Sequence, residues 1–352
     1  MSPPVLHKFA NRLRRLSTLC LVLCSLSIVS PPVRASTDAV NESHWVPVEG
    51  GQVYVLVRGA HRTSPILLWL HGGPGGAERP LFRLFNSDLE RDFVVAYLDQ
   101  RGAGRSYDAD ASLDRLTIAQ HLQDLDRVVD DLRARYLQPK VVLVGHSWGS
   151  ALGLLYARDH PLKVAAFVSV GQVVATTENE TAQLTFVTNE AARRAESKDL
   201  QSALHDIGNP PLGWQQDLAL QQWVNRYGGV FHQPPSQLKA MVTGVALGYV
   251  TPWEIYKIIA GNNASLSAMH VELQSLDLRK ALTQLDVPLL MIAGKYDRVT
   301  DRVLARQLFD QLRDTDKTFV TFYASAHNVP FEEPARFNSL VRDFAMIHAG
   351  SK

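Results

Sequence analysis

The sequence predicts an α/β protein with a mostly parallel, doubly wound sheet and one helical insertion. Three observations support this fold class. Short, continuous apolar runs recur along the chain, and segments with helical apolar spacing lie between them. The alternation then fails between residues 172 and 282, where Gln, Asn and Ala are frequent. Strands that alternate with helices form a parallel sheet with helices on its faces, so the stretch without alternation is interpreted as an insertion.

The apolar runs predict strands that are buried on both faces. A run of four to eight apolar residues without polar alternation is typical of a central strand in a parallel sheet. Two β-rich runs, at 44–49 and 52–58, come before the first of them. The continuous runs lie at 65–70, 93–98, 141–144, 164–170, 288–292 and 318–323.

Helices are predicted between and after these strands. Residues 117–136 place apolar side chains at helical spacing, and 303–312 and 334–347 have similar patterns. We therefore expect a core formed by residues 36–171 and 283–352, with residues 172–282 as a helical lid.

The first 35 residues have the pattern of a secretory signal peptide. A basic segment is followed by an apolar stretch at 16–29 and by small residues that end at Ala35. The apolar stretch is short for a membrane span, which takes about 20 residues. We expect cleavage after Ala35 and a secreted or periplasmic protein without stable membrane insertion; an uncleaved N-terminal anchor is the alternative. Cys20 and Cys24 would leave with this segment, so the mature chain would have no cysteine.

Composition and charge narrow the function further. The 352 residues are 46% hydrophobic and 20% charged, as in an ordinary globular protein. Loss of residues 1–35 removes five basic residues and no acidic one, which changes the formal net charge from +1 to −4. The sequence has no basic patch of the kind that would predict nucleic-acid binding. The sequence shows no cluster of metal ligands, and the glycine-rich segment 71–76 lacks the Lys-Ser/Thr ending of a phosphate-binding loop, so no cofactor is expected.

A nucleophile is predicted at Ser147. The segment 145–149 reads GHSWG, directly after an apolar strand and before an Ala- and Leu-rich helix. This context is typical of the G-x-S-x-G nucleophile elbow, in which a tight turn exposes the serine above the sheet. A helix that begins at Trp148 would direct its dipole toward the nucleophile.

The general base is predicted at His327. A serine hydroxyl needs a base to remove its proton, and His327 follows the strand at 318–323, in a loop at the strand's C-terminal end. Other histidines are less suitable, because they lie in the expected lid or at the far edge of the sheet: His232, His270 and His160.

The acid that orients this base is predicted at Asp297. It follows the strand at 288–292 and lies between Ser147 and His327 in the chain order Ser, acid, His. Asp301 is expected to cap the next helix, and Asp286 comes before its strand, at the wrong end.

An oxyanion hole requires two N–H donors. We expect one from the backbone of Trp148 and the other from Gly73, where a side chain would block the carbonyl's approach. His71 is expected to hydrogen-bond within its loop and hold the loop's shape.

Together these motifs resemble the proline iminopeptidase (prolyl aminopeptidase) family of α/β hydrolases. The resemblance covers about residues 45–170 and 283–347, and within it Asp99, Arg101 and Arg105 look structural. It rests on HGGPGG at 71–76, LDQRGAGRS at 98–106, GHSWGS at 145–150, GKYD at 294–297 and the His327 loop.

The expected lid departs from the family pattern. Family peptidases typically have a W-x-x-W-E segment whose Glu binds the substrate's free amino terminus, and only Trp253-Glu254 is similar to it. Glu178, Glu180 and Glu254 are candidates for this role, although a solvated helix face is the more ordinary reading of each.

Three functions remain open from the sequence. The first is an aminopeptidase that releases N-terminal proline or another small residue from peptides. The second is an esterase or lipase-like enzyme that uses the same triad on carboxylic esters. The third is a catalytically inactive binding protein on this fold, which the complete set of predicted site residues disfavours. The expected partner is therefore a small peptide or ester, and the sequence carries no signal for an oligomeric state.

Overall fold

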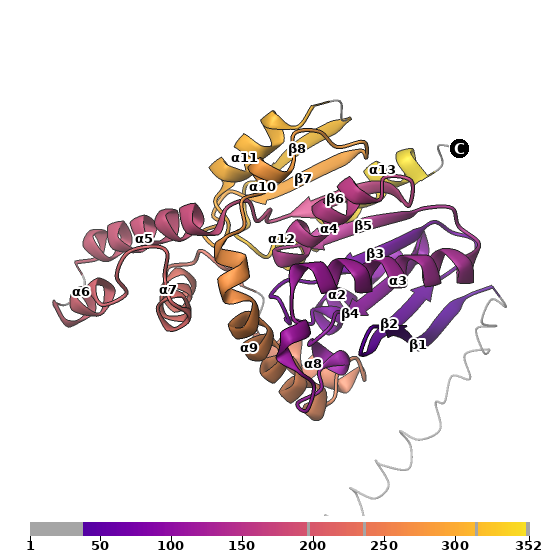
Figure 1. The fold of residues 1–352 in the computed structure, drawn as a ribbon, viewed down its shortest axis with the longest axis horizontal. Coiled ribbons are helices and arrows are strands. Elements are labelled where there is room, and N and C mark those ends of the chain that lie inside the picture. Colours follow the sequence, from indigo (N-terminus) through magenta and orange to yellow (C-terminus); the bar gives the residue numbers. More distant parts are fainter. Residues whose placement is uncertain (1–37, 196–197, 235–236, 314–315, 350–352) are drawn as a thin grey trace, which may run out of the picture. The chain divides into compact units, whose positions relative to one another are not determined.

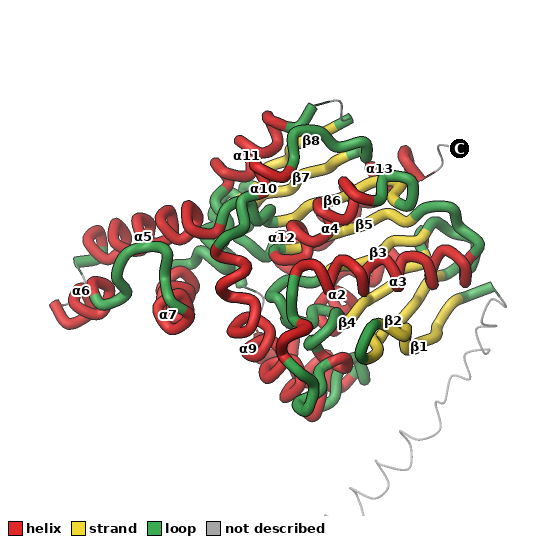
Figure 2. The backbone as a smooth tube through the Cα atoms, viewed as in Figure 1, coloured by secondary structure: helices red, strands yellow, loops and turns green. Residues whose placement is uncertain are grey.

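The computed structural model describes residues 38–195, 198–234, 237–313 and 316–349. Its centre is an eight-stranded sheet in the order β1-β2-β4-β3-β5-β6-β7-β8, drawn as adjacent yellow strands in Figure 2. β2 pairs antiparallel with β1 and with β4, and all other neighbours are parallel. The strands are β1 (Val40–Val48), β2 (Gly51–Gly59), β3 (Ile66–Leu70), β4 (Val94–Asp99), β5 (Val141–His146), β6 (Val164–Val170), β7 (Leu289–Gly294) and β8 (Lys317–Phe322).

The central strands are apolar throughout because both of their faces are covered. Along β3, Ile66, Leu68 and Leu70 join one hydrophobic cluster. Leu67 and Trp69 point the other way and join a second cluster. The doubly wound α/β fold and each expected strand are thereby confirmed, with ends that differ by a few residues.

Helices from different parts of the chain cover the two faces. α3, α4 and α11 contribute to the first cluster, and α2 and α13 contribute to the second. These helices are labelled in Figure 1. The bounds are α2 (Arg79–Asn86), α3 (Ile118–Tyr136), α4 (Trp148–Asp159), α11 (Arg302–Gln311), α12 (Val329–Glu332) and α13 (Pro334–Ala349), with short 3-10 helices η1 (Ser87–Arg91), η2 (Gly104–Ser106) and η3 (Leu113–Arg115).

Between β6 and β7, where the strand pattern stops, the described residues form six helices, and we call this stretch the insertion. Buried residues of α5 and α7, among them Val187 and Leu220, form a separate hydrophobic cluster. The helices are α5 (Thr176–Arg193), α6 (Lys198–His205), α7 (Trp214–Arg226), α8 (Gln237–Ala246), α9 (Pro252–Gln274) and α10 (Leu278–Ala281).

The expectation about the N-terminus is not addressed by this fold. The signal peptide at residues 1–35 lies outside the described residues. Among the residues that are described, no helix is both long and apolar enough to cross a membrane.

Helix α9 approaches two glycine-rich loops very closely. A Cβ atom on Gly75 would lie 2.5 Å from the carbonyl oxygen of Gly261, and one on Gly102 would lie 2.6 Å from Ser265 Oγ. Asn262 Nδ2 also donates a hydrogen bond of 2.8 Å to the carbonyl oxygen of Pro74. Such close backbone contact is possible only where side chains are absent, so these glycines seat α9 on the loops.

Candidate active site

Ser147 occupies a strained turn between β5 and α4. Its φ of 53° and ψ of −121° lie in a region that residues other than glycine rarely adopt. Its backbone N–H donates to the carbonyl oxygen of Val170 at 2.9 Å. A Cβ on Gly145 would collide with the backbone of Gly149, and one on Gly149 would collide with the backbone of Leu70. These contacts explain why glycine stands on both sides of the turn.

Asp297 and His327 come together across the ends of β7 and β8. His327 Nδ1 lies 2.9 Å from Asp297 Oδ2, and Thr300 Oγ1 donates to the same oxygen at 2.8 Å. The other carboxylate oxygen accepts from the backbone N–H groups of Val299 and Thr300. Burial alone would raise the pKa of Asp297, but the neighbouring His327 and these hydrogen bonds outweigh burial and lower that pKa.

The hydrogen bond between this pair sets the tautomer of the imidazole. The Asp297 carboxylate is ionised and can only accept, so Nδ1 of His327 carries a hydrogen and Nε2 is left as the basic nitrogen. The structure shows no hydrogen bond between Nε2 and Ser147 Oγ, so proton transfer between these two atoms stays a prediction. In enzymes without bound substrate this contact is often long and shortens only when substrate binds.

The HGGPGG loop follows β3 and lies beside the elbow. His71 Nε2 accepts from the backbone N–H of Gln100 at 3.0 Å, and its Nδ1 therefore donates to the carbonyl oxygen of Gly72 at 2.8 Å. Complete burial lowers the pKa of His71, so the ring is neutral and holds the loop. Gly73 has a φ of +108°, and a Cβ there would lie 2.5 Å from the backbone nitrogen of Gly76. Glycine is thus required at position 73 by the backbone of the loop itself. The sequence-based expectation gave another reason, namely that a side chain there would block the approach of a substrate carbonyl.

Trp148 is the first residue of α4, where a backbone N–H has no partner within the helix. Its indole Nε1 donates to Gln100 Oε1 at 3.0 Å. This hydrogen bond ties the elbow to the loop after β4. Gly73 and Trp148 remain the proposed oxyanion donors.

The three glutamates considered for the substrate's amino group have other partners. Glu178 pairs with Arg279 at the surface, and Glu180 accepts from the backbone N–H of Leu212 at 3.0 Å. Glu254 binds Arg79 at 2.8 Å and also Arg105. The structure shows no hydrogen bond or ion pair between any of the three and the residues Ser147, Asp297 and His327.

The other candidate histidines make contacts elsewhere in the structure. His270 lies in α9 and binds the carbonyl oxygen of Leu212 at 2.9 Å. His232 stacks on Tyr296, and His160 stacks on Tyr156. None of them is hydrogen-bonded to Asp297.

Sequence reasoning missed a second carboxylate–imidazole pair at the elbow. Glu78 Oε1 lies 2.7 Å from Nδ1 of His146, the residue before Ser147. His146 Nε2 lies 3.1 Å from the carbonyl oxygen of His327, and the two rings are 4.8 Å apart. Burial alone would lower the pKa of His146, but Glu78 outweighs it and the pKa is raised. His146 lies within GHSWGS and Glu78 lies two residues after HGGPGG, so both stand in or near the motifs that were singled out, although nothing in the sequence pairs them.

Gly171 was also missed, although it follows β6 at the active-site end. With a φ of +57°, a Cβ there would lie 2.8 Å from Cε1 and 2.9 Å from Nδ1 of His327. Only a glycine leaves room for the imidazole.

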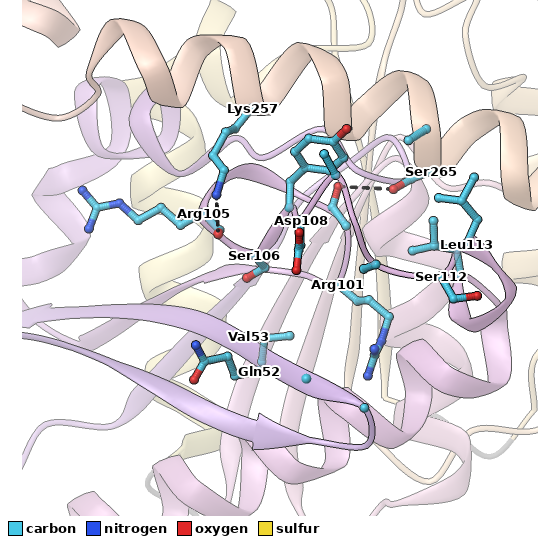
Figure 3. Close-up of a pocket in the computed structure, with 18 of the residues that line it drawn as sticks. Gln52, Val53, Arg101, Arg105, Ser106, Asp108, Ser112, Leu113, Lys257 and Ser265 are labelled. Atoms are coloured by element: carbon cyan, nitrogen blue, oxygen red, sulfur yellow. Dashed lines mark hydrogen bonds between the residues drawn. The ribbon is translucent and has the colours of Figure 1, made fainter.

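A cavity of about 800 Å³ lies between the β1–β2 hairpin, the segment that follows β4, and α9 (Figure 3). Figure 3 shows Lys257 of α9 reaching the carbonyl oxygen of Arg105, at 3.3 Å. Ser147, Asp297 and His327 do not line this cavity, so it is separate from the proposed catalytic centre. Among the described residues, no three His, Cys, Asp or Glu side chains gather in a metal-binding arrangement.

The sheet order and the elbow turn indicate an α/β hydrolase, and comparison with known families agrees. Residues 65–334 match the model of the alpha/beta hydrolase fold family, and the chain belongs to this family.

Particular relatives are aminopeptidases by name. The chain is 28% identical over 303 residues to a probable aminopeptidase, YbaC, of Bacillus subtilis, and the match covers 84% of this chain and 93% of the relative. It is 26% identical to a proline iminopeptidase of Thermoplasma volcanium, over 86% of this chain and 96% of the relative. The crystal structure of a proline iminopeptidase of Mycobacterium smegmatis superposes with a TM-score of 0.65 at 20% identity, over 88% of this chain and 99% of the other. At that identity the superposition supports the fold alone.

Proposed function

We propose that this protein is a serine aminopeptidase that releases proline or another small residue from the N-terminus of peptides. One observation supports the chemistry most directly. Buried Asp297 and His327 are hydrogen-bonded at 2.9 Å, and Ser147 occupies the elbow turn with strained backbone geometry. A serine, a histidine and a carboxylate in this order and arrangement are the components of an acyl-transfer triad.

The proposed reaction runs through an acyl-enzyme. Ser147 Oγ attacks the carbonyl carbon of the first peptide bond while His327 Nε2 takes the hydroxyl proton. The oxyanion is stabilised by the backbone N–H groups of Gly73 and Trp148. His327 then gives the proton to the departing amine, and the ester on Ser147 remains. Water, deprotonated by His327, hydrolyses this ester and restores the serine hydroxyl.

Asp297 acts through His327 and has no contact with the substrate in this scheme. Its ionised carboxylate keeps the hydrogen of His327 on Nδ1 and stabilises the imidazolium that forms in each step.

The peptide substrate class rests on the relatives. Two of them, named aminopeptidase and proline iminopeptidase, match over most of their own length. The same triad would also hydrolyse carboxylic esters, so the esterase function remains the alternative.

The substrate class can be tested with chromogenic substrates. We expect prolyl or alanyl p-nitroanilide to be cleaved, and the Ser147→Ala variant to lose this activity by roughly 10⁴-fold or more. Cleavage of p-nitrophenyl acetate alone would instead support an esterase. A folded protein that neither cleaves these substrates nor reacts with a fluorophosphonate probe would show a catalytically inactive member of the fold.

A further inference from the structure

A carboxylate that the proposed mechanism does not use lies next to the nucleophile. Glu78 follows the HGGPGG loop and comes directly before α2. A Cβ built on Gly72 would lie 3.1 Å from Glu78 Oε1 and 3.1 Å from Ser147 Cβ. The carboxylate oxygen and the nucleophilic side chain are therefore separated by no more than twice that distance. Gly72, which has no side chain, leaves the space between them open.

The two oxygens of this carboxylate are in different situations. Oε1 is bonded to His146 Nδ1 at 2.7 Å. Oε2 is buried and has no hydrogen-bond partner within the described part of the chain. A buried carboxylate oxygen without a donor is costly, and buried polar atoms in folded proteins nearly always have a partner. Glu78 therefore has one acceptor without a donor, on a side chain that is 15% exposed.

Two carboxylate–imidazole pairs lie near the nucleophile. The carbonyl oxygen of His327 can only accept, so Nε2 of His146 carries a hydrogen. Its second nitrogen lies 2.7 Å from Glu78 Oε1, so both ring nitrogens of His146 are hydrogen-bonded, and Glu78 raises the pKa of His146. Asp297 adds a second carboxylate with a lowered pKa. Two carboxylates, Glu78 and Asp297, are therefore each hydrogen-bonded to an imidazole near the nucleophile.

We infer that Glu78 binds the α-ammonium group of the substrate's first residue and thereby selects free N-termini. This inference rests on the proposed aminopeptidase function. The α-nitrogen is two covalent bonds away from the carbonyl carbon that Ser147 attacks. An ammonium group held by Glu78 consequently places that carbon at the nucleophile. An N-acylated residue has no charge to offer and brings a bulky group toward the carboxylate. The recognition group thus comes from the core, on the loop that carries Gly73, and not from the insertion.

The test uses two substrates that differ only in the amino group. These are the p-nitrophenyl esters of alanine and of N-acetylalanine, and the readout is the ratio of their kcat/KM values. We expect the wild-type protein to favour the free amine, and Glu78→Gln to lower this ratio about 10- to 100-fold, the range for a lost charge-assisted hydrogen bond. Glu78→Asp keeps the charge and should retain part of the preference. It also serves as the second variant if Glu78→Gln does not fold.

Glu190→Gln is the matched control. Glu190 is on α5 and pairs with Arg193 at 2.7 Å, so the ratio should stay at the wild-type value. An unchanged ratio in folded Glu78→Gln would overturn the role of Glu78 and leave the aminopeptidase function intact. A wild-type protein that does not favour the free amine would remove the aminopeptidase function, and this inference with it.

Discussion

Gly171 shows how one missing side chain shapes the proposed site. It has a φ of +57° and contacts the imidazole of His327. Gly208 has a φ of +83°, and a Cβ at that position would meet no atom of the described residues within 4 Å. The two positions thus share the same backbone restriction but differ in the space around them.

We expect Gly171→Ala to lower kcat/KM by about 10²-fold, because the new methyl group pushes the imidazole of His327 away from Ser147. Gly208→Ala carries a similar backbone cost, about 1–2 kcal/mol for a left-handed residue, without any clash. Steady-state kinetics together with urea unfolding would separate the two effects. Equal activity in the two variants would contradict a steric role for Gly171.

The positions of Ser147, Asp297 and His327 could be predicted because each follows a strand that the apolar pattern locates. The structure brings Asp297 and His327 into contact, as their place after neighbouring parallel strands suggests. Glu78 and His146 could not be paired in this way. Their contact depends on the path of a loop and on side-chain direction, and neither leaves a periodic signal in the sequence.

At the scale of elements, α9 is attached to the core by buried charges. Thr251 and Glu254 form a capping box at its first turn. The Glu254 carboxylate also binds Arg79 and Arg105, and Arg79 Nε in turn lies 3.3 Å from Asp99 Oδ1. Burial alone would raise the pKa of Glu254, but Arg105, the backbone of Thr251 and Arg79 outweigh it and lower the pKa to about 2.

We expect Glu254→Gln to lower the free energy of unfolding by about 3 kcal/mol at pH 7, since it removes the carboxylate that binds the buried guanidinium of Arg79 and the partly exposed one of Arg105. The pKa of this carboxyl is depressed on folding, from 4.5 to about 2. Its stabilisation is therefore fully present above pH 4.5 and is lost as the pH falls toward 2.

Urea unfolding of wild type and variant at about pH 7 and about pH 3 would measure this difference. Glu178→Gln, at an exposed pair with Arg279, should change the unfolding free energy by about 1 kcal/mol or less. A Glu254→Gln difference that is as large in acid as at neutral pH would contradict the assignment.

The strands could be located from the sequence, whereas the insertion could be predicted as helical without its individual helices, for a physical reason. A strand covered on both faces must be apolar, as Ile66–Leu70 is. Helix α9 is held by close contact at Gly261 and by the ion pairs of Glu254. Neither kind of contact requires a periodic apolar stripe. Helix α2 was missed as well, because it has only eight residues. Three of its first five residues are arginine or proline.

For the molecule as a whole, we propose that residues 1–35 direct export and are then removed. Expression of the full chain in a bacterial host should give an exported protein whose N-terminal residue is Ser36, as read by N-terminal sequencing and intact mass. Cys20 and Cys24 are the two cysteines of the sequence, so the processed protein should not react with a thiol reagent. A full-length, thiol-reactive protein in the membrane fraction would instead indicate an uncleaved anchor.

The seating of α9 on the glycine loops has a mechanical consequence for the whole enzyme. Gly261 touches Gly75, and Asn262 holds the carbonyl oxygen of Pro74, one residue beyond the proposed oxyanion donor Gly73. Any outward swing of α9 to admit substrate must release that carbonyl, and its return must restore it. A movement of α9 would therefore be coupled to the position of the loop that carries Gly73.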